Sequence, residues 1–273
     1  MLEIPESHTI ARQLNEVARG KGITSVAAGT SPHGFAFYFG DPAAYPALLE
    51  GRRIDGAEAI AGQVEITLGE ARLLFHDGVN IRYLETGRKA PAKHQLYIVL
   101  DDGSSLVCTV QMYGGMWAFR EGQNDNFYYL AAKEKPSPLT AAFDEAYFDS
   151  LWRDLKPTLS IKALLATEQR IPGLGNGVLQ DILFEARINP QTKIASVTDS
   201  KKAALFGSVK KTLAAMTAGG GRDTEKDLFG ASGGYRTKLS SKTVAHPCPV
   251  CGATIVRKAY MGGNVYFCPT CQP

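Results

Sequence analysis

Hydrophobic positions in the first part of the chain follow a helical spacing and then a strand-like spacing. Ile10, Leu14 and Val17 recur at intervals of three or four residues, which predicts a helix over residues 8–20. From residue 23 to about residue 119, the apolar residues fall in short alternating or continuous runs separated by turn signals such as Asp-Gly. The first half is therefore predicted to be a β-sandwich or barrel that carries one N-terminal helix.

The second half has a different pattern, in which longer periodic segments predict helices. These lie at roughly residues 142–152, 160–169, 177–186 and 199–216. A Pro-containing stretch precedes them, and a long glycine-rich, charged loop follows them over residues 219–234. We therefore divide the chain into an N-terminal domain (1–132), a linker (133–140), a helical domain (141–234) and a C-terminal module (235–273).

The composition is that of an ordinary globular protein, but its charge is uneven. Of the 273 residues, 44% are hydrophobic and 21% are charged, and no apolar run has the length of a signal peptide or a membrane span. We therefore expect a cytoplasmic protein with no membrane partner, and no heptad pattern indicates more than a monomer. Residues 1–140 contain 13 basic and 16 acidic residues, whereas residues 141–273 contain 17 and 11. Because phosphate contacts dominate nucleic-acid affinity, the basic second half favours a polyanionic partner.

Four of the five cysteines form two Cys-x-x-Cys pairs near the end of the chain, at Cys248, Cys251, Cys268 and Cys271. Two such pairs with sixteen residues between them are typical of a tetrahedral zinc site, with a short hairpin between the pairs. Disulfides or a coincidence of turn sequences are the alternatives, but the lone Cys108 argues against a disulfide framework. A module of about 25 residues cannot bury a core, so we expect one structural Zn²⁺ to hold it together.

Residues 161–190 have the pattern of a helix, a glycine-punctuated turn and a second helix. Gly173 and Gly175 would let the backbone approach another group closely and adopt positive φ. Asn176 stands where an N-cap is expected for the helix that begins near Gly177. Exposed amides at such a helix start, with a short polar side chain, would form a phosphate seat. A capped helical hairpin inside a bundle is the alternative that the spacing leaves open.

This segment resembles the helix-two-turn-helix of the formamidopyrimidine-DNA glycosylase and endonuclease VIII family. That family has a Gly-x-Gly-Asn turn preceded by a Lys fourteen residues earlier, and Lys162 and Asn176 match both positions. The family's order of elements is also the order predicted here over essentially the whole chain. The resemblance implies an α+β multidomain fold with an N-terminal β-sandwich and one helix, a helical helix-two-turn-helix domain and a zinc-finger β-hairpin. It also implies that Lys162 and Asn176 bind DNA.

The N-terminal motif of the family, Pro-Glu-Leu-Pro-Glu after the initiator Met, is only partly present. Glu3, Pro5 and Glu6 match, whereas Leu2 replaces the proline whose amine forms a Schiff base with C1′ of the damaged nucleotide. Leu2 favours retention of Met1, so the resemblance implies as nucleophile the terminal amine of Met1 or, where Met1 is removed, of Leu2. It also implies Glu3 and Glu6 as catalytic carboxyl groups. Glu3 would protonate the deoxyribose ring oxygen. The alternative is that Leu2 packs and the terminus is inert.

The run from Gln111 to Trp117 is similar to the Gln-Leu-Tyr-Gly-Val-Trp run of the endonuclease VIII branch. Family members insert a side chain into the gap that a flipped nucleotide leaves, because a duplex cannot otherwise yield its base to a pocket. The resemblance makes Gln111, Met112 and Tyr113 the candidates for this wedge. The alternative is that a Tyr and a Trp near the end of a strand belong to the core.

Two basic positions outside these motifs are further candidates for phosphate contacts. Lys93, or its neighbour His94, falls where the family has a phosphate-binding Lys before a strand. Arg236 falls where members bind the phosphate of the flipped nucleotide, after the loop over 219–234 that corresponds to a base-capping lid. A solvated strand start and a solvated basic linker are the alternatives.

The predicted zinc hairpin departs from the family at one position. Gly263 occupies the place of the Arg that the family carries five residues before the third cysteine. Phosphate contacts near the hairpin tip would then depend on Arg257, Lys258 or Asn264 instead.

With this resemblance, the sequence predicts a base-excision DNA glycosylase with abasic-site lyase activity, of the endonuclease VIII-like branch. Its partner would be duplex DNA that contains a damaged base or an abasic site, and it would flip and release an oxidised pyrimidine without a small-molecule cofactor. One rival is a catalytically silent lesion-binding protein on the same fold, because of Leu2 and Gly263. A second is a zinc-stabilised RNA-binding module, since the charge pattern does not separate the two polymers.

Overall fold

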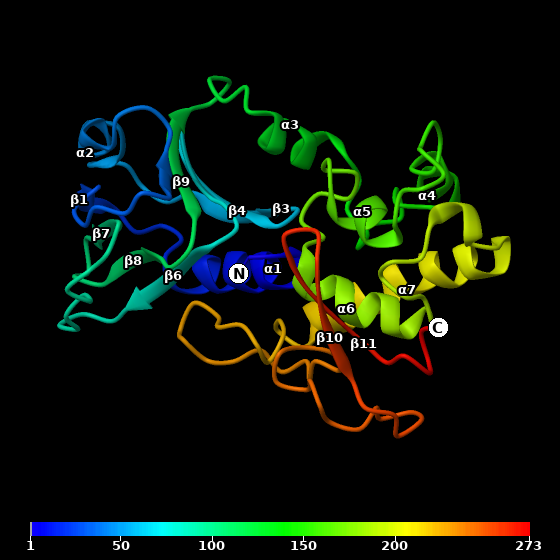
Figure 1. The fold of residues 1–273 in the computed structure, drawn as a ribbon. Coiled ribbons are helices and arrows are strands. Elements are labelled where there is room, and N and C mark those ends of the chain that lie inside the picture. Colours follow the sequence, from blue (N-terminus) through cyan, green and yellow to red (C-terminus); the bar gives the residue numbers. More distant parts are fainter. Residues whose placement is uncertain (1) are drawn as a thin grey trace.

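The computed structural model describes residues 2–273, so the catalytic candidate Met1 lies outside the described residues. The N-terminal half consists of two β-sheets packed face to face (Figure 1). Its strands are β1 (Ile23–Ala28), β2 (Ala36–Tyr38), β3 (Gly56–Ile60), β4 (Gln63–Leu68), β5 (Ala71–Phe75), β6 (Val79–Leu84), β7 (Leu96–Leu100), β8 (Ser105–Val110) and β9 (Gly114–Arg120). One sheet has the order β1-β7-β8-β6 and the other the order β2-β9-β5-β4-β3. Strands β2 and β9 are parallel, and the other neighbours are antiparallel.

The alternating sequence pattern explains this sandwich. Leu96, Ile98 and Leu100 of β7 are buried, and the two residues between them are half-buried, because successive side chains of a strand point to opposite faces. Buried faces of both sheets meet in one apolar core. The predicted N-terminal β-sandwich is therefore confirmed, and the α+β class with it.

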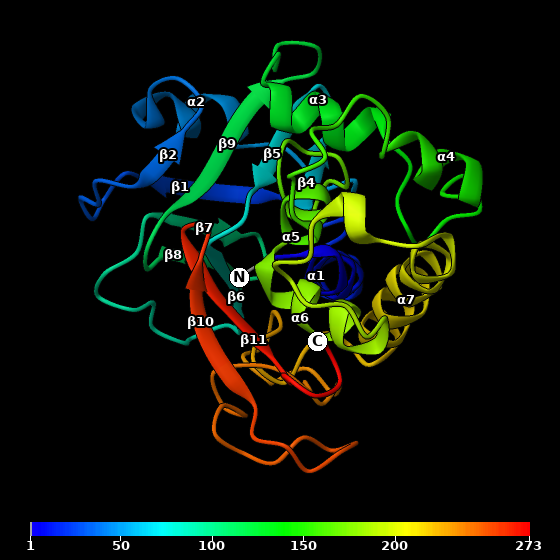
Figure 2. The same ribbon diagram turned by 45° about the vertical axis from the view of Figure 1, so that its right-hand side comes forward.

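Helix α1 (Ile4–Val17) joins the two halves of the molecule. It begins earlier than predicted and has Pro5 in its first turn, where a missing N–H leaves no helical hydrogen bond unmade. Leu2 packs into the core of the sandwich, whereas Ile4 packs into the core of the helical half. Figure 2 shows α1 at the centre, between the sheets and the helices. The first described residues are therefore held where the two halves meet.

The helical half contains four helices close to the predicted ranges. They are α4 (Glu145–Ser150), α5 (Ile161–Ala166), α6 (Asn176–Glu185) and α7 (Asp199–Ala218). Three further short helical elements, α2 (Tyr45–Leu49), η1 (Pro42–Ala44) and η2 (Ile194–Ser196), lie outside the predicted ranges. So does α3 (Phe127–Glu134), which Asn126 caps by accepting a 2.9 Å hydrogen bond from the backbone of Tyr128.

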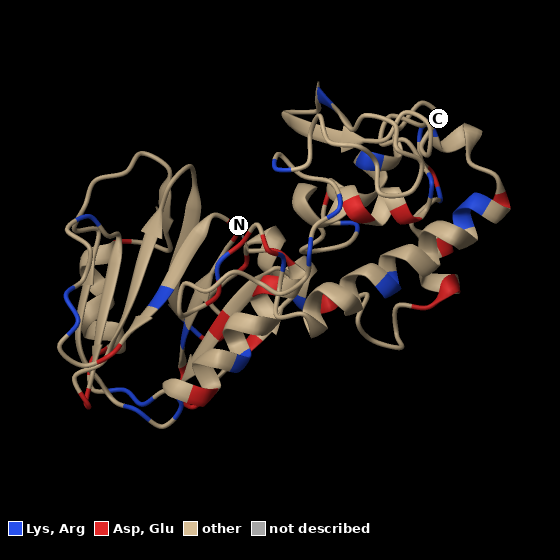
Figure 3. Ribbon diagram, turned by 90° about the horizontal axis from the view of Figure 1, so that it is seen from below, with Lys and Arg blue, Asp and Glu red and all other residues tan. Residues whose placement is uncertain are grey.

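The C-terminal module is a hairpin of β10 (Val256–Tyr260) and β11 (Gly263–Phe267), and β11 contacts α6. Phe184 of α6 packs with Leu239 and Ile255 against two of the cysteines in a small separate core. Acidic and basic positions occur in both halves of the molecule (Figure 3). Within residues 2–273, no helix combines the length and the apolar character that a membrane span needs.

Candidate active site and nucleic-acid interface

Glu3 lies at the meeting point of α1, α6 and the segment after α7, and it is only 2% exposed. Its carboxylate accepts two hydrogen bonds of 2.8 Å, from the backbone N–H groups of Gly177 and Val178 in the first turn of α6. A carboxylate is favoured there because it faces unpaired amides at the positive end of the helix dipole. The side chain of the third residue is thereby fixed against the turn that precedes α6.

This contact corrects two expectations for the start of α6. Asn176 is the first residue of the helix and not its N-cap, because the extended Gly175 precedes it and the Glu3 carboxylate supplies the cap. The same carboxylate occupies amides that were expected to seat a phosphate. Gly173 does have a positive φ of 76°, whereas Gly175, at −98°, does not. A Cβ on Gly175 would still stand only 2.7 Å from the carboxyl carbon of Glu3, so the expected close approach is present.

A buried guanidinium from the glycine-rich segment completes this cluster. Arg222 donates from Nε and Nη2 to the two carboxylate oxygens of Glu6, at 3.0 and 2.8 Å, and its backbone N–H donates to Glu6 at 3.0 Å. Its Nη1 lies 3.6 Å from Oε1 of Glu3. At Gly177, a Cβ would stand 1.6 Å from that Nη1, so a larger residue there would displace the guanidinium. We call Glu3, Glu6 and Arg222 the clasp.

The clasp contains two carboxyl groups and one cation. Their burial and their mutual charges shift the pKa values of Glu3 and Arg222. Burial raises the pKa of Glu3 above its ordinary value, although the charge of Arg222 and the two amide hydrogen bonds oppose the change. Burial would lower the pKa of Arg222, but the neighbouring Glu3 and Glu6 carboxylates raise it, so the guanidinium stays charged. A carboxyl group whose pKa is raised can hold a proton and donate it to a bound substrate. Glu3 is therefore suited to a general-acid role.

The remainder of the segment over 219–234 is also tied to the first half. Gln13 of α1 donates from Nε2 to Asp227 at 2.8 Å and accepts from the backbone N–H of Leu228 at 3.0 Å. Leu228 is fully buried in the sandwich core, and its carbonyl accepts a hydrogen bond from β6. This segment therefore connects the two halves, and its role as a base-capping lid stays a prediction.

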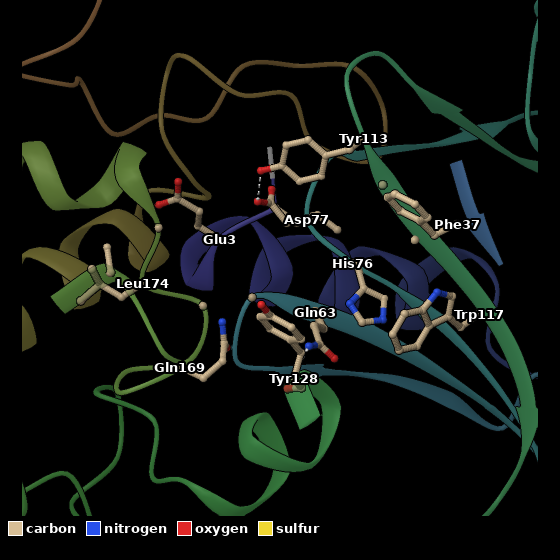
Figure 4. Close-up of a pocket in the computed structure, with 17 residues that line it drawn as sticks. Glu3, Phe37, Gln63, His76, Asp77, Tyr113, Trp117, Tyr128, Gln169 and Leu174 are labelled. Carbon is tan, nitrogen blue, oxygen red and sulfur yellow. Dashed lines mark hydrogen bonds between the residues drawn. The ribbon is translucent and has the colours of Figure 1, made fainter. Parts of the chain in front are cut away.

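A cavity of about 540 Å³ lies on the other side of Glu3 (Figure 4). Its wall comes from the start of β4, the turn between β5 and β6, β9, α3 and the turn before α6. The rings of His76 and Trp117 pack together in this wall with their centroids 3.8 Å apart. Phe37 and Tyr128 also line the cavity, and they are 49% and 55% exposed. We call this space the aromatic cavity.

Several polar atoms in the wall of the aromatic cavity lack a hydrogen-bond partner among the described residues. They are Gln63 Oε1, His76 Nε2, Trp117 Nε1 and Asp77 Oδ1. Burial lowers the pKa of His76 to about 4, so its ring is neutral near pH 7. Burial raises the pKa of Asp77, to which the hydroxyl of Tyr113 donates a 3.1 Å hydrogen bond. The wall therefore offers unpaired donors and acceptors, and none of the described residues in it is Lys or Arg.

Three of the predicted DNA-binding residues of the second half, Lys162, Asn176 and Asn264, meet at the tip of the C-terminal hairpin. Lys162 Nζ donates to the backbone carbonyl of Tyr260 at 2.8 Å, and Asn176 Nδ2 donates to that of Asn264 at 3.0 Å. A Cβ on Gly263 would stand 3.8 Å from both Lys162 Nζ and Asn176 Nδ2. The turn before α6 and the hairpin thus form one surface, although the sequence places them nearly ninety residues apart.

The other predicted residues lie in more varied places. Leu2 is 4% exposed and packs in the sandwich core while it also lines the aromatic cavity. The loop between β8 and β9 presents Gln111, Met112 and Tyr113, and Met112 is 70% exposed. Four further candidates lie on the surface, and their roles stay predictions. They are Lys93, Arg236, Arg257 and Lys258, of which Lys258 donates to Gln191.

The thiols of Cys248, Cys251, Cys268 and Cys271 converge, with all four sulfur atoms within 4.8 Å of one another. Two of the Sγ–Sγ distances are 3.4 and 3.9 Å, far longer than a disulfide bond of about 2 Å. Around a tetrahedral ion with Zn–S bonds of about 2.3 Å, sulfur atoms are about 3.8 Å apart. The cluster could therefore hold a metal ion.

Sequence reasoning missed Arg222, Gln63 and His76. Arg222 stands in a glycine-rich charged segment that indicates only a loop, and its carboxylate partner Glu6 is 216 residues away. Gln63 is a polar residue at the first position of a strand, next to the turn at Gly62. His76 immediately precedes an Asp-Gly turn, so it resembles an ordinary turn residue. No local pattern marks any of them.

Comparisons with known proteins find similarity to formamidopyrimidine-DNA glycosylases. Residues 1–117 match the family model described as the formamidopyrimidine-DNA glycosylase N-terminal domain. The chain is 30% identical to the formamidopyrimidine-DNA glycosylase of Symbiobacterium thermophilum, over 100% of this chain and 90% of that protein. It is also 30% identical to that of Halorhodospira halophila, over the full length of both.

Solved structures show the same likeness over nearly the whole chain. The MutM (Fpg) protein of Thermus thermophilus aligns with a TM-score of 0.82 and 26% identity, covering 99% of this chain and 98% of that one. The Fpg protein of Lactococcus lactis in complex with DNA containing an abasic site aligns with a TM-score of 0.85 and 25% identity, covering 99% of both. Each of these neighbours covers both halves and the C-terminal hairpin.

Proposed function

This chain belongs to the formamidopyrimidine-DNA glycosylase family, and on that premise we propose that it is a base-excision DNA glycosylase with associated abasic-site lyase activity. The observation that carries the proposal is the position of Glu3, a buried carboxyl group with a raised pKa between the first residues of the chain and the turn before α6. Its partner would be duplex DNA with a damaged base or an abasic site, as in the complexes of the Lactococcus lactis protein.

In this reaction the terminal amine is the nucleophile and Glu3 is the acid. The amine nitrogen bonds to C1′ of the damaged nucleotide while the glycosidic bond breaks and the base leaves with the electron pair. Proton donation by Glu3 to the deoxyribose ring oxygen then opens the sugar to a Schiff base, from which the 3′ phosphate can be eliminated. Leu2, in place of proline, makes the amine primary, and a primary amine also forms an imine with an aldehyde.

Phosphates would be held by the surface around the hairpin tip. Lys162 and Asn176 point their nitrogen atoms at the backbone of this tip, and burial lowers the pKa of Lys162, which a nearby phosphate would reverse. A structural Zn²⁺ on the four cysteines would hold the hairpin in place beside them. The exposed Met112 supports a wedge role for the loop between β8 and β9, as does the resemblance to the endonuclease VIII branch. We include in the proposal that the protein belongs to the endonuclease VIII-like branch and that it removes oxidised pyrimidines.

Borohydride trapping tests the nucleophile directly. The purified protein is incubated with a duplex that contains one abasic site, reduced with borohydride, digested and analysed by mass spectrometry. We expect a covalent adduct on the N-terminal peptide, at Met1 or Leu2. A matched protein whose terminus is blocked by acetylation should bind the same duplex and give no adduct.

A second candidate function, a catalytically silent lesion-binding protein, is favoured by two observations. Among the described residues that line the aromatic cavity beside Glu3, none is Lys or Arg, and Gly263 leaves the hairpin tip without the family's arginine. Tight binding of abasic DNA with no trapped adduct at any pH from 6 to 9, and no base released from a duplex that carries an oxidised pyrimidine, would establish this candidate and exclude the glycosylase.

A further inference from the structure

A second carboxyl group in the wall of the aromatic cavity has no part in the chemistry proposed for Glu3. Asp77 lies in the turn between β5 and β6 and lines the cavity together with Leu2 and Glu3. In the view of Figure 4, Asp77 and Tyr113 lie toward Glu3, whereas His76 lies farther from it. Asp77 therefore shares the cavity with the first described residue of the chain.

The backbone on both sides of Asp77 fixes the turn that carries it. Gly78 has a positive φ of 84°, and a Cβ there would stand 1.7 Å from the carbonyl oxygen of Tyr113, so only glycine allows this close approach. On the other side, the backbone N–H of His76 donates a 2.9 Å hydrogen bond to the carbonyl of Gly115 in β9. The turn is therefore held against the loop between β8 and β9.

The two oxygen atoms of the Asp77 carboxylate differ in their hydrogen bonding. Oδ2 accepts a 3.1 Å hydrogen bond from the hydroxyl of Tyr113, whereas Oδ1 is buried and has no hydrogen-bond partner among residues 2–273. Burial raises the pKa of Tyr113 to about 12, so its hydroxyl keeps its proton near pH 7 and remains a donor. Because buried polar atoms are nearly always paired, the unpaired Oδ1 indicates a donor that arrives during function.

The groups around Asp77 leave it suited to accept a proton. Burial raises its pKa, the hydrogen bond from Tyr113 and the nearby amide of Gly78 oppose this change, and the carboxylate of Glu225 adds to it. The adjacent His76 is neutral near pH 7. None of the described residues that line the aromatic cavity is Lys or Arg, so its wall supplies no cation to pair with Oδ1. An amine that reacts in this cavity would supply one.

We propose that Asp77 is the general base that takes a proton from the terminal amine as this amine attacks C1′. The amine belongs to Leu2 or to the residue before it, and consecutive Cα atoms are only about 3.8 Å apart, so it lies close to the cavity that Leu2 lines. This inference rests on the proposed function, because it requires the Schiff-base reaction, and it adds a base to the acid Glu3.

The proton transfer balances the reaction at the nitrogen atom. The amine nitrogen uses its electron pair to bond to C1′, the base leaves with the pair of the glycosidic bond, and the nitrogen becomes positively charged. One N–H proton then passes to Oδ1 of Asp77, which returns an electron pair to the nitrogen. That pair forms the C=N bond when Glu3 protonates the ring oxygen and the bond from C1′ to this oxygen breaks. Asp77 later releases its proton to water.

Single-turnover trapping on a duplex with one abasic site tests this role, since the same bond from nitrogen to C1′ forms there. The protein is in excess over the duplex, samples are reduced with borohydride at increasing times, and the rate constant of adduct formation is measured. Asp77→Asn keeps the size of the side chain and an oxygen that can accept from Tyr113, but it is not a base. We expect the rate constant to fall about a hundredfold. The affinity for a duplex with a tetrahydrofuran analogue should not fall.

Chemical rescue separates a base from a carboxylate that only supports the structure. Asp77→Ala leaves a space that formate can enter, so added formate should restore part of the rate of adduct formation. Asp77→Asn fills that space and should not respond. Sodium chloride at the same ionic strength is the matched salt, because phosphate contacts make DNA affinity depend on salt. Asp101→Asn, at an exposed position between β7 and β8 that does not line the cavity, should react at the native rate.

The outcomes separate this inference from the proposed function. Equal rate constants for the native chain and Asp77→Asn reject Asp77 as the base, while trapping by the native chain leaves the proposed function standing. A slow Asp77→Asn together with a folded Asp77→Ala that formate does not restore assigns Asp77 a structural role and also rejects the inference. Circular dichroism verifies folding, and Asp77→Asn keeps the test decisive if Asp77→Ala does not fold. If the native chain gives no adduct, the proposed function fails and this inference fails with it.

Discussion

The two sides of Glu3 differ in how completely their buried polar atoms are paired. On the side of the clasp, Glu3, Glu6 and Arg222 are joined by ion pairs and short hydrogen bonds. On the side of the aromatic cavity, the buried Gln63 and the ring nitrogens of Trp117 and His76 keep unpaired atoms. An unpaired buried polar atom costs roughly 1 to 3 kcal/mol, whereas a paired network holds its members in one arrangement. The clasp therefore fixes the carboxyl group that we propose as the acid, whereas the cavity wall keeps polar atoms available to a bound group.

Among substitutions in the clasp, removal of Arg222 is expected to reduce the stability of the protein most. Arg222→Met leaves two buried carboxyl groups without their cation, and we expect the free energy of unfolding to fall by about 3 to 5 kcal/mol at pH 7. Urea denaturation followed by circular dichroism measures the loss. Arg12→Met is the matched control, because Arg12 pairs with Glu16 on the exposed face of α1 and should contribute less than about 1 kcal/mol. Equal effects of the two substitutions would mean that the clasp is no more than a surface pair.

The protonation of Glu3 makes the free energy of unfolding depend on pH, and the sign of this dependence follows from the raised pKa. Because the folded pKa of Glu3 is raised, its protonation stabilises the fold fully below its ordinary value of 4.5, and that contribution is lost as pH rises through the folded pKa. Glu3→Gln cannot titrate. The stability of the native chain relative to Glu3→Gln should therefore decline above pH 4.5, by about 1.4 kcal/mol for each unit of pKa shift. A difference that stays constant between pH 4.5 and 8 would show that burial does not raise this pKa.

A substitution at the hairpin tip that should increase DNA affinity tests whether a cation at this position contacts a phosphate. Gly263→Arg would place a guanidinium beside Lys162 and Asn176, where the Cβ has ordinary contact distances of 3.8 Å. We expect the affinity for an abasic duplex to rise about tenfold and the dependence of affinity on salt to steepen by about one ion. Fluorescence anisotropy over a range of salt concentrations measures both.

Ala259→Arg adds the same charge to the same hairpin and is the control for Gly263→Arg. Ala259 is exposed and pairs with Asn264, so it belongs to the opposite face from the Gly263–Tyr260 pair. It should raise the affinity much less. An equal rise with both substitutions would mean that the added charge acts at long range and that the tip does not hold a particular phosphate.

The elements of this fold were predictable where their signals are local, and the clasp was not. Alternation at Leu96, Ile98 and Leu100 predicts a half-buried strand, and the two Cys-x-x-Cys pairs predict their own convergence. The cap of α6 could not be predicted from the residues beside it, because the carboxylate comes from Glu3, 174 residues earlier. The roles of Arg222 and Gln63 depend on neighbouring residues that are distant in the sequence and come together only in the folded chain.

Two buried glutamines, Gln13 beside the segment over 219–234 and Gln63 in the cavity wall, extend the comparison, and the effect expected at Gln63 is the smallest. Gln13 is bonded at both ends of its amide, to Asp227 and Leu228, whereas Gln63 has an unpaired Oε1. Gln13→Leu leaves two former partners unsatisfied and should destabilise the protein by about 1 to 3 kcal/mol, while Gln63→Leu removes an unpaired atom and should stabilise it by about 1 kcal/mol. Thermal and urea unfolding of the two variants give the signs directly. Opposite signs mean that the native chain keeps Gln63 at a cost to stability, as expected for a residue whose hydrogen bonds are completed by a bound group. If both substitutions destabilise equally, Gln63 is paired within the fold and the cavity wall is as complete as the clasp.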